Sequence, residues 1–96
     1  MRAEVFKVVQ QAVETLNEEL DYDTLRKVTD DTPIFGGEHG IDSLSLVTLI
    51  VGLERDVEAT FGKKVVLADE KAMSMRNSPY RSVGALVDYI VQRLEA

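Results

Sequence analysis

The sequence from residue 40 to residue 62 is GIDSLSLVTLIVGLERDVEATFG. Its apolar residues return at steps of three and four, which is the period of one face of an α-helix. Asp42 precedes the first repeat, where its carboxylate can accept hydrogen bonds from the free backbone N–H groups of a first turn. Gly62 follows the last apolar residue, a common place for glycine at a helix end. The pattern predicts a helix over residues 42–61 whose buried face comprises Leu46, Leu49, Ile50, Leu53, Val57 and Phe61.

Two further stretches share this amphipathic period. Residues 3–20 form one, and residues 82–94, which begin with a capping serine at Ser82, form the other. Their apolar positions are Val5, Phe6, Val9, Ala12, Val13, Leu16 and Leu20, then Val83, Leu86, Val87, Ile90, Val91 and Leu94. Both stretches therefore predict helices that bury one face in a common core.

The connections between these helices are less regular. Residues 21–41 contain turn and breaker residues, with one helical turn expected at 23–28 and with Ile34 and Phe35 expected to pin the loop to the core. Residues 68–75 predict a short third helix that ends before Pro79. The sequence thus predicts one all-α domain over residues 1–96, a four-helix bundle with three longer helices and one short one.

The composition limits the classes of function. The net charge is −6, from 17 acidic and 11 basic residues, so the balance argues against nucleic-acid binding and favours partners with basic surfaces. The chain has no cysteine, which excludes disulfides, thiolate metal sites and a cysteine nucleophile. It shows neither a signal peptide nor a stretch apolar enough to span a bilayer. We therefore expect a cytoplasmic, monomeric, acidic protein.

Ser43 occupies the position with the clearest chemical potential. In the first turn of the predicted helix its hydroxyl would be exposed, and a phosphodiester built on it would lie among unpaired N–H groups. The positive end of the helix dipole would stabilise that negative charge. Spacing alone is also explained by Asp42 and Ser43 acting only as a helix cap.

The residues around Ser43 favour a modification site over a helix cap alone. Gly40 to Leu44, followed by LVTLIVGLE at 46–54 and by Phe61, resembles the modification site and second helix of the acyl carrier family. Residues 82–90, SVGALVDYI, resemble the last helix of that family, so the resemblance covers roughly residues 3–94. It implies an acyl-carrier bundle in which a phosphopantetheinyl transferase moves 4′-phosphopantetheine from coenzyme A to Ser43. It also implies that Asp42 supports recognition by the transferase and supports the metal ion of that enzyme.

The resemblance implies a carrier and not an enzyme. The thiol of the arm would hold an acyl group as a thioester and present it to acyl-loading and acyl-using enzymes. Polar but uncharged positions on the second helix and a longer segment at 62–81 depart from the members that serve fatty acid synthesis. They argue against a role in bulk fatty acid synthesis and favour a specialised carrier dedicated to one pathway, of fatty acid or secondary metabolite biosynthesis. An aminoacyl or peptidyl carrier, or an unmodified helical interaction module, remains an alternative.

A second apolar stripe predicts where partners dock. At about 100° per residue, Leu44, Val47 and Val51 fall outside the buried face of the second helix, with Glu54 and Glu58 beside them. Exposed apolar residues with a charged rim often mark an interaction site. The resemblance agrees, because the matching helix is the main recognition element of the family. We expect enzymes with basic docking surfaces to bind at these five residues.

Other candidate sites lack parts that their chemistry needs. Ser43 has no flanking glycines of a nucleophile elbow, and the single histidine, His39, is expected in a solvated loop. The acidic residues from Asp21 to Asp31 do not match a calcium loop, because Leu25 and Arg26 occupy the places of a ligand and a glycine. The sequence therefore predicts neither a catalytic residue nor a metal site.

Overall fold

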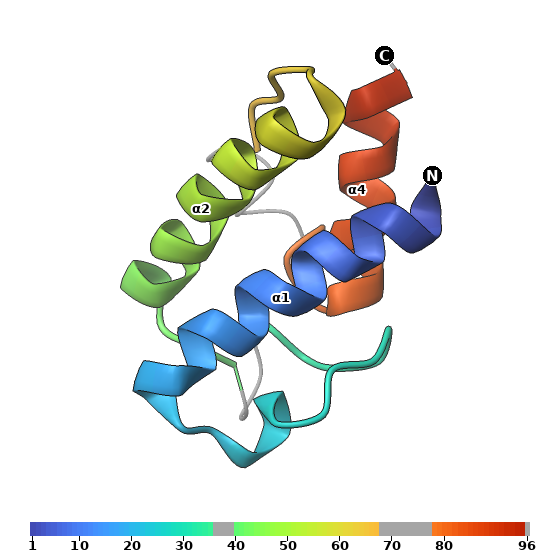
Figure 1. Cartoon of the computed structure of the whole chain (residues 1–96). Coiled ribbons are helices and arrows are strands. Elements are labelled where there is room, and N and C mark those ends of the chain that lie inside the picture. Colours follow the sequence, from blue (N-terminus) through green and yellow to red (C-terminus); the bar gives the residue numbers. More distant parts are fainter. Residues whose placement is uncertain (36–39, 68–77, 96) are drawn as a thin grey trace.

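The computed structural model describes residues 1–35, 40–67 and 78–95. Within these ranges it contains α1 (Arg2–Leu20), a 3-10 turn η1 (Asp23–Leu25), α2 (Ser43–Phe61) and α4 (Val83–Glu95), and no strand (Figure 1). The three longer predicted helices are confirmed, and η1 lies inside the predicted turn at 23–28. The predicted short helix at 68–75 lies outside the described residues, as does His39.

The helix ends follow local sequence chemistry. The N–H of Asp21 donates to the carbonyl of Asn17, and Asp21 takes a left-handed conformation with φ 54° that ends α1. Gly62 ends α2 in the same conformation, with φ 69°. At the start of α4, the Ser82 hydroxyl accepts a hydrogen bond from the N–H of Ala85 at 3.1 Å. The predicted caps at Gly62 and Ser82 are therefore confirmed.

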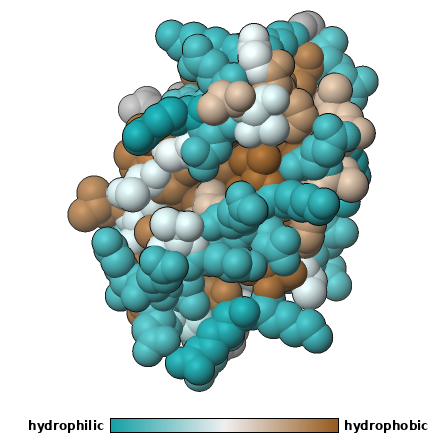
Figure 2. Space-filling model, in the orientation of Figure 1, coloured by the Kyte–Doolittle hydropathy of each residue, from teal (hydrophilic) through white to brown (hydrophobic). Residues whose placement is uncertain are grey.

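The core forms where α1 packs against both α2 and α4. All three helices contribute side chains that are at most 4% exposed, among them Val5, Val9, Val13, Leu46, Leu49, Ile50, Leu53, Val57, Leu86, Val87 and Ile90. Phe61, predicted to be buried, is only half-buried, because it is the last residue of α2 and lies at the edge of the core. Hydrophilic side chains cover the outward face of α1 (Figure 2).

Buried side chains and backbone pairing hold the connection between α1 and α2. Ile34 is 1% exposed, while Phe35 is half-buried against the core. The N–H groups of these two residues donate to the carbonyls of Arg81 and Tyr80, at 3.2 Å and 3.0 Å. Single bridges pair Pro33 with Ser82 and Phe35 with Ile41. The connection is therefore fixed to the chain before α4, and the buried Ile41 lies directly before the N-cap of α2.

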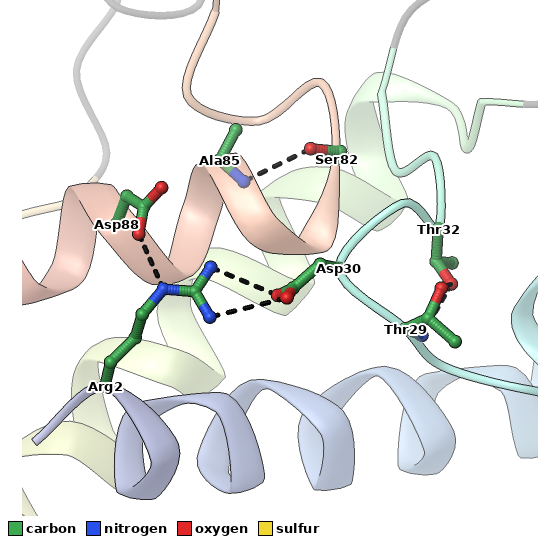
Figure 3. Close-up of polar contacts among 7 residues, drawn as sticks. All are labelled: Arg2, Thr29, Asp30, Thr32, Ser82, Ala85 and Asp88. Atoms are coloured by element: carbon green, nitrogen blue, oxygen red, sulfur yellow. Dashed lines mark hydrogen bonds and ion pairs between the residues drawn. The ribbon is translucent and has the colours of Figure 1, made fainter.

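Arg2 joins three parts of the fold at the surface (Figure 3). Its Nε donates to Asp88 of α4 at 2.8 Å, and its Nη2 donates to Asp30 of the connection at 3.1 Å. Hydrogen bonds to Asp88 and then to Asp30 are the main reasons that the pKa of Arg2 is raised. The Arg2 side chain is exposed, so its ion pairs orient these three segments and add little to stability.

Two helical glycines should respond to alanine in opposite ways. A Cβ at Gly84 would lie 3.0 Å from the Asp30 carbonyl oxygen, which also accepts from the N–H of Gly84 at 2.8 Å, whereas a Cβ at Gly52 meets no atom within 4 Å. We expect Gly84→Ala to lower the free energy of unfolding by about 1–3 kcal/mol through overpacking. Gly52→Ala should raise it by about 0.5–1 kcal/mol by restricting the unfolded chain.

Urea denaturation of both variants beside the wild-type chain measures this difference. A Gly84→Ala variant as stable as Gly52→Ala would show that the connection at Asp30 is not packed against α4 as described.

Candidate functional site

The site begins at the junction between the connection and α2. Ile41 is 4% exposed and anchors the chain, Asp42 is extended with ψ 169°, and Ser43 is the first helical residue. The carboxylate of Asp42 accepts a hydrogen bond from the N–H of Ser45 at 2.7 Å, and its carbonyl accepts from the N–H of Leu46 at 3.0 Å. The predicted N-cap is confirmed, and it fixes the first turn that presents Ser43.

Ser43 is exposed at the positive end of α2. An exposed residue at this position is one that a second protein can reach. The helix dipole there favours a negative group. The position therefore suits a covalently attached phosphodiester, so the residues present fit a phosphopantetheine arm.

Asp42, the residue before Ser43, carries a negative charge at the same helix end. Its pKa is lowered, chiefly because its carboxylate accepts the hydrogen bond from the Ser45 N–H. A lowered pKa means that the cap stabilises the fold above the ordinary pKa of an aspartate. That stabilisation is lost as the pH falls through the lowered value. At neutral pH the side chain is an ionised carboxylate.

Replacing Asp42 should separate its two expected roles. Asn caps a helix about as well as Asp but carries no charge. We expect Asp42→Asn to keep the thermal midpoint near that of the wild-type chain at neutral pH, and Asp42→Ala to lower it. Both variants should be modified by the transferase much more slowly than the wild-type chain, because a charge that can aid the transferase and its metal is lost.

Initial rates of mass gain and thermal melts between neutral and acid pH test these expectations. The midpoints of the wild-type and Asp42→Ala chains should converge as the pH falls, because the cap is then protonated. Wild-type modification rates in both variants would leave Asp42 as a helix cap alone.

Three apolar side chains on α2 face solvent, as the helical period predicted. We call Leu44, Val47 and Val51 the apolar strip; their side chains are 77%, 45% and 47% exposed. The strip begins next to Ser43 and runs along two turns of α2. Val66, in the stretch that follows α2, adds another large apolar residue at 59% exposure. The role of the strip in binding partners stays a prediction.

The two acidic residues beside the strip lie in different environments. Glu58 is exposed, whereas Glu54 is half-buried and its Oε2 accepts a hydrogen bond from the N–H of Leu67 at 2.7 Å. The carbonyl of Leu67 in turn accepts from the hydroxyl of Tyr80. Glu54 thus holds a neighbouring segment of its own chain, which the helical period could not reveal.

The junction at Leu67 is the main feature that sequence reasoning missed. Leu67 and Tyr80 are both fully buried, and the ring of Tyr80 meets that of Tyr89 edge to face at 6.2 Å between centroids. A buried tyrosine usually finds a partner for its hydroxyl, which was the available signal. The apolar run Val65-Val66-Leu67 was another, and the structure buries Val65 and Leu67 while Val66 is exposed.

A groove of about 710 Å³ lies between α1 and α2. Figure 2 shows apolar surface along the hollow between these helices, with paler residues on its sides. The lining residues of α1 are Val8, Gln11, Ala12, Thr15, Leu16 and Glu19, and those of α2 are Val47, Thr48, Leu49, Val51, Gly52, Arg55, Asp56, Ala59 and Thr60. The groove shares Val47 and Val51 with the apolar strip.

Two other kinds of feature are absent from the described part of the chain. There, no group of three or more histidine, aspartate or glutamate side chains could hold a metal ion. No helix in the same ranges has the length and apolar character needed to cross a membrane.

Comparison with known proteins identifies the family. The family model described as a phosphopantetheine attachment site matches residues 10–71, which is more than half of the chain. No curated protein and no solved structure matches the sequence. The matched range contains α2 with its first turn, where Ser43 is exposed. The chain therefore belongs to the family of phosphopantetheine attachment domains, whose cofactor is covalently bound 4′-phosphopantetheine.

Proposed function

We propose that the protein carries acyl groups as thioesters on a phosphopantetheine arm attached to Ser43, and presents them to the enzymes of a specialised biosynthetic pathway. One observation carries the assignment to Ser43. The range that matches the family contains two serines, Ser43 and Ser45, and of these Ser43 is exposed while Ser45 is half-buried.

The first turn of α2 prepares the serine for modification. The cap by Asp42 and the buried side chain of Ile41 hold the backbone on the N-terminal side of Ser43, so the attachment point has a fixed place at the helix end. On transfer, the oxygen of Ser43 bonds to the phosphorus of phosphopantetheine. Adenosine 3′,5′-bisphosphate leaves from coenzyme A, and the hydroxyl proton passes to the transferase.

The bound arm supplies the thiol that the chain lacks. With no cysteine of its own, the chain can carry a thioester only on an added group. The protein's contribution is then to hold the attachment point and to offer a surface to partner enzymes. The apolar strip starts one residue after Ser43, so an enzyme docked on it would lie within reach of the arm.

The exposed charges favour basic partners. The chain carries a net charge of −6, and Glu58 lies exposed beside the strip. An enzyme with lysine or arginine around an apolar contact would complement this surface, and the attraction would weaken as salt rises. Because Glu54 is occupied by Leu67, Glu58 is the better candidate for this charged contact.

Mass spectrometry of the protein purified from the cells that make it tests the proposed cargo. We expect the mass to exceed that of the bare chain by the arm plus an acyl group. Treatment with neutral hydroxylamine, which cleaves thioesters, should remove the acyl group and leave a chain that carries only the arm. Release of an amino acid or peptide would instead make the protein an aminoacyl or peptidyl carrier. A mass equal to the bare chain would favour an unmodified interaction module.

A further inference from the structure

We propose that the α1–α2 groove is a second docking face, which binds an amphipathic helix of a partner protein that carries apolar side chains on one face and lysine or arginine beside them. This face goes beyond the proposed carrier function, because it serves to hold the carrier and not to load its arm.

The shape of the groove fits a helix. Its α2 wall extends from Val47 to Thr60, which is about 20 Å at the rise of an α-helix. The groove runs between helices that lie with the C-terminal end of α1 near the start of α2 (Figure 1). A partner helix of roughly four turns would match this length and could place one apolar side chain per turn against the floor.

Small residues leave open space in the groove. Gly52 has no atom within 4 Å of the position that its Cβ would take, and two other small residues, Ala12 and Ala59, also line the groove. The α2 backbone is therefore open to close approach at Gly52. Val8, Leu16 and Val51 supply apolar surface along the same floor, so an inserted leucine or phenylalanine would bury apolar area on both sides.

The charges around the groove indicate a basic partner. Glu19 and Asp56 line it together with Arg55, and the exposed side of α1 next to it carries Glu14 and Glu18 together with one cation, Lys7. Acidic groups thus prevail along the α1 border. A second copy of this chain would bring the same acidic surface and be repelled, whereas a helix with lysine or arginine would be attracted.

A helix in the groove would leave the attachment site free. At about 100° per residue, Gly52 lies about 180° around α2 from Ser43, so the two residues face opposite sides of the helix. Val47 and Val51 belong both to the groove and to the apolar strip, so a bound helix would leave Ser43 itself uncovered but would compete with enzymes that dock on the strip.

A peptide titration followed by NMR of the whole chain tests the proposal. The probe is a synthetic helix of about four turns with leucine on one face and lysine elsewhere, and its control has glutamate in place of lysine. We expect the lysine peptide to shift amide signals of groove residues, to bind more weakly as salt rises, and to bind better than the glutamate peptide. Shifts confined to other surfaces, equal binding of both peptides, or no binding would overturn the proposal.

Variants then test the groove itself. Gly52→Leu should weaken binding of the lysine peptide roughly tenfold or more by filling the groove. Gln92→Leu, which adds the same side chain at an exposed position of α4, should leave it unchanged. Ala59→Leu, at an exposed position of the groove, repeats the test should Gly52→Leu melt early. Unchanged affinity in a folded groove variant, or a dimer of the wild-type chain formed through this face, would overturn the assignment.

Discussion

The variant Ser43→Ala will fold like the wild-type chain and will gain no mass when incubated with coenzyme A and a broad phosphopantetheinyl transferase. The fold should persist because Ser43 is exposed and the cap of α2 depends on the carboxylate of Asp42. Modification should fail completely because the oxygen that forms the phosphodiester is missing. Intact mass and a thermal melt of the same sample measure both outcomes.

Ser45→Ala is the matched control for this experiment. Ser45 is the other serine within the residues that match the family, and it is half-buried in the same helical turn. Its replacement should leave the chain open to modification. A mass gain in Ser43→Ala, or its loss in Ser45→Ala alone, would move the attachment point away from Ser43.

The variants Val47→Asp and Val51→Asp will be loaded with acyl groups by the cognate enzyme about tenfold more slowly or worse, because a charge in a buried contact costs at least the ~1.4 kcal/mol to which a tenfold change corresponds. Their thermal midpoints should stay near that of the wild-type chain, since both side chains are almost half exposed. Rates of loading of the arm-bearing protein, followed by mass, measure the effect.

Gln92→Asp provides the control for an added charge, because Gln92 is exposed on α4, away from the apolar strip. It should load at the wild-type rate. Unfolding of the valine variants would show that the strip belongs to the core, and wild-type loading of both folded variants would show that partners dock elsewhere.

The helices could be predicted because their signals are local. The spacing of apolar residues gave α1, α2 and α4, and single residues such as Asp42, Gly62 and Ser82 gave three of their ends. Each of these signals acts within one or two turns of the chain. The same period also predicted that the apolar strip is exposed, because that exposure depends only on where its residues lie around one helix.

Contacts between distant segments could not be predicted in this way. The bond from Leu67 to Glu54 and the burial of Tyr80 depend on how the chain returns after α2. Pairing of the 33–35 stretch with residues before α4 likewise joins parts of the chain that no local pattern connects. Helical spacing therefore predicted the position of Glu54 on α2 correctly. It did not predict that the segment at Leu67 would bond to Glu54.

The candidate site combined a local signal with a resemblance. Spacing alone predicted that Asp42 caps α2, and the structure confirms this cap. The same cap is expected whether or not Ser43 carries an arm, so the cap does not identify Ser43 as a modification site. The family match supplies the chemistry, and the exposure of Ser43 supplies the position. The α1–α2 groove had no signal of its own in the sequence, because its shape depends on how two helices pack around small residues such as Gly52.

The most direct measurement is fragment mass spectrometry of the wild-type chain after reaction with coenzyme A and a phosphopantetheinyl transferase. We predict a single added phosphopantetheine, located on Ser43. An unchanged mass, or an arm on any other residue, would contradict this prediction.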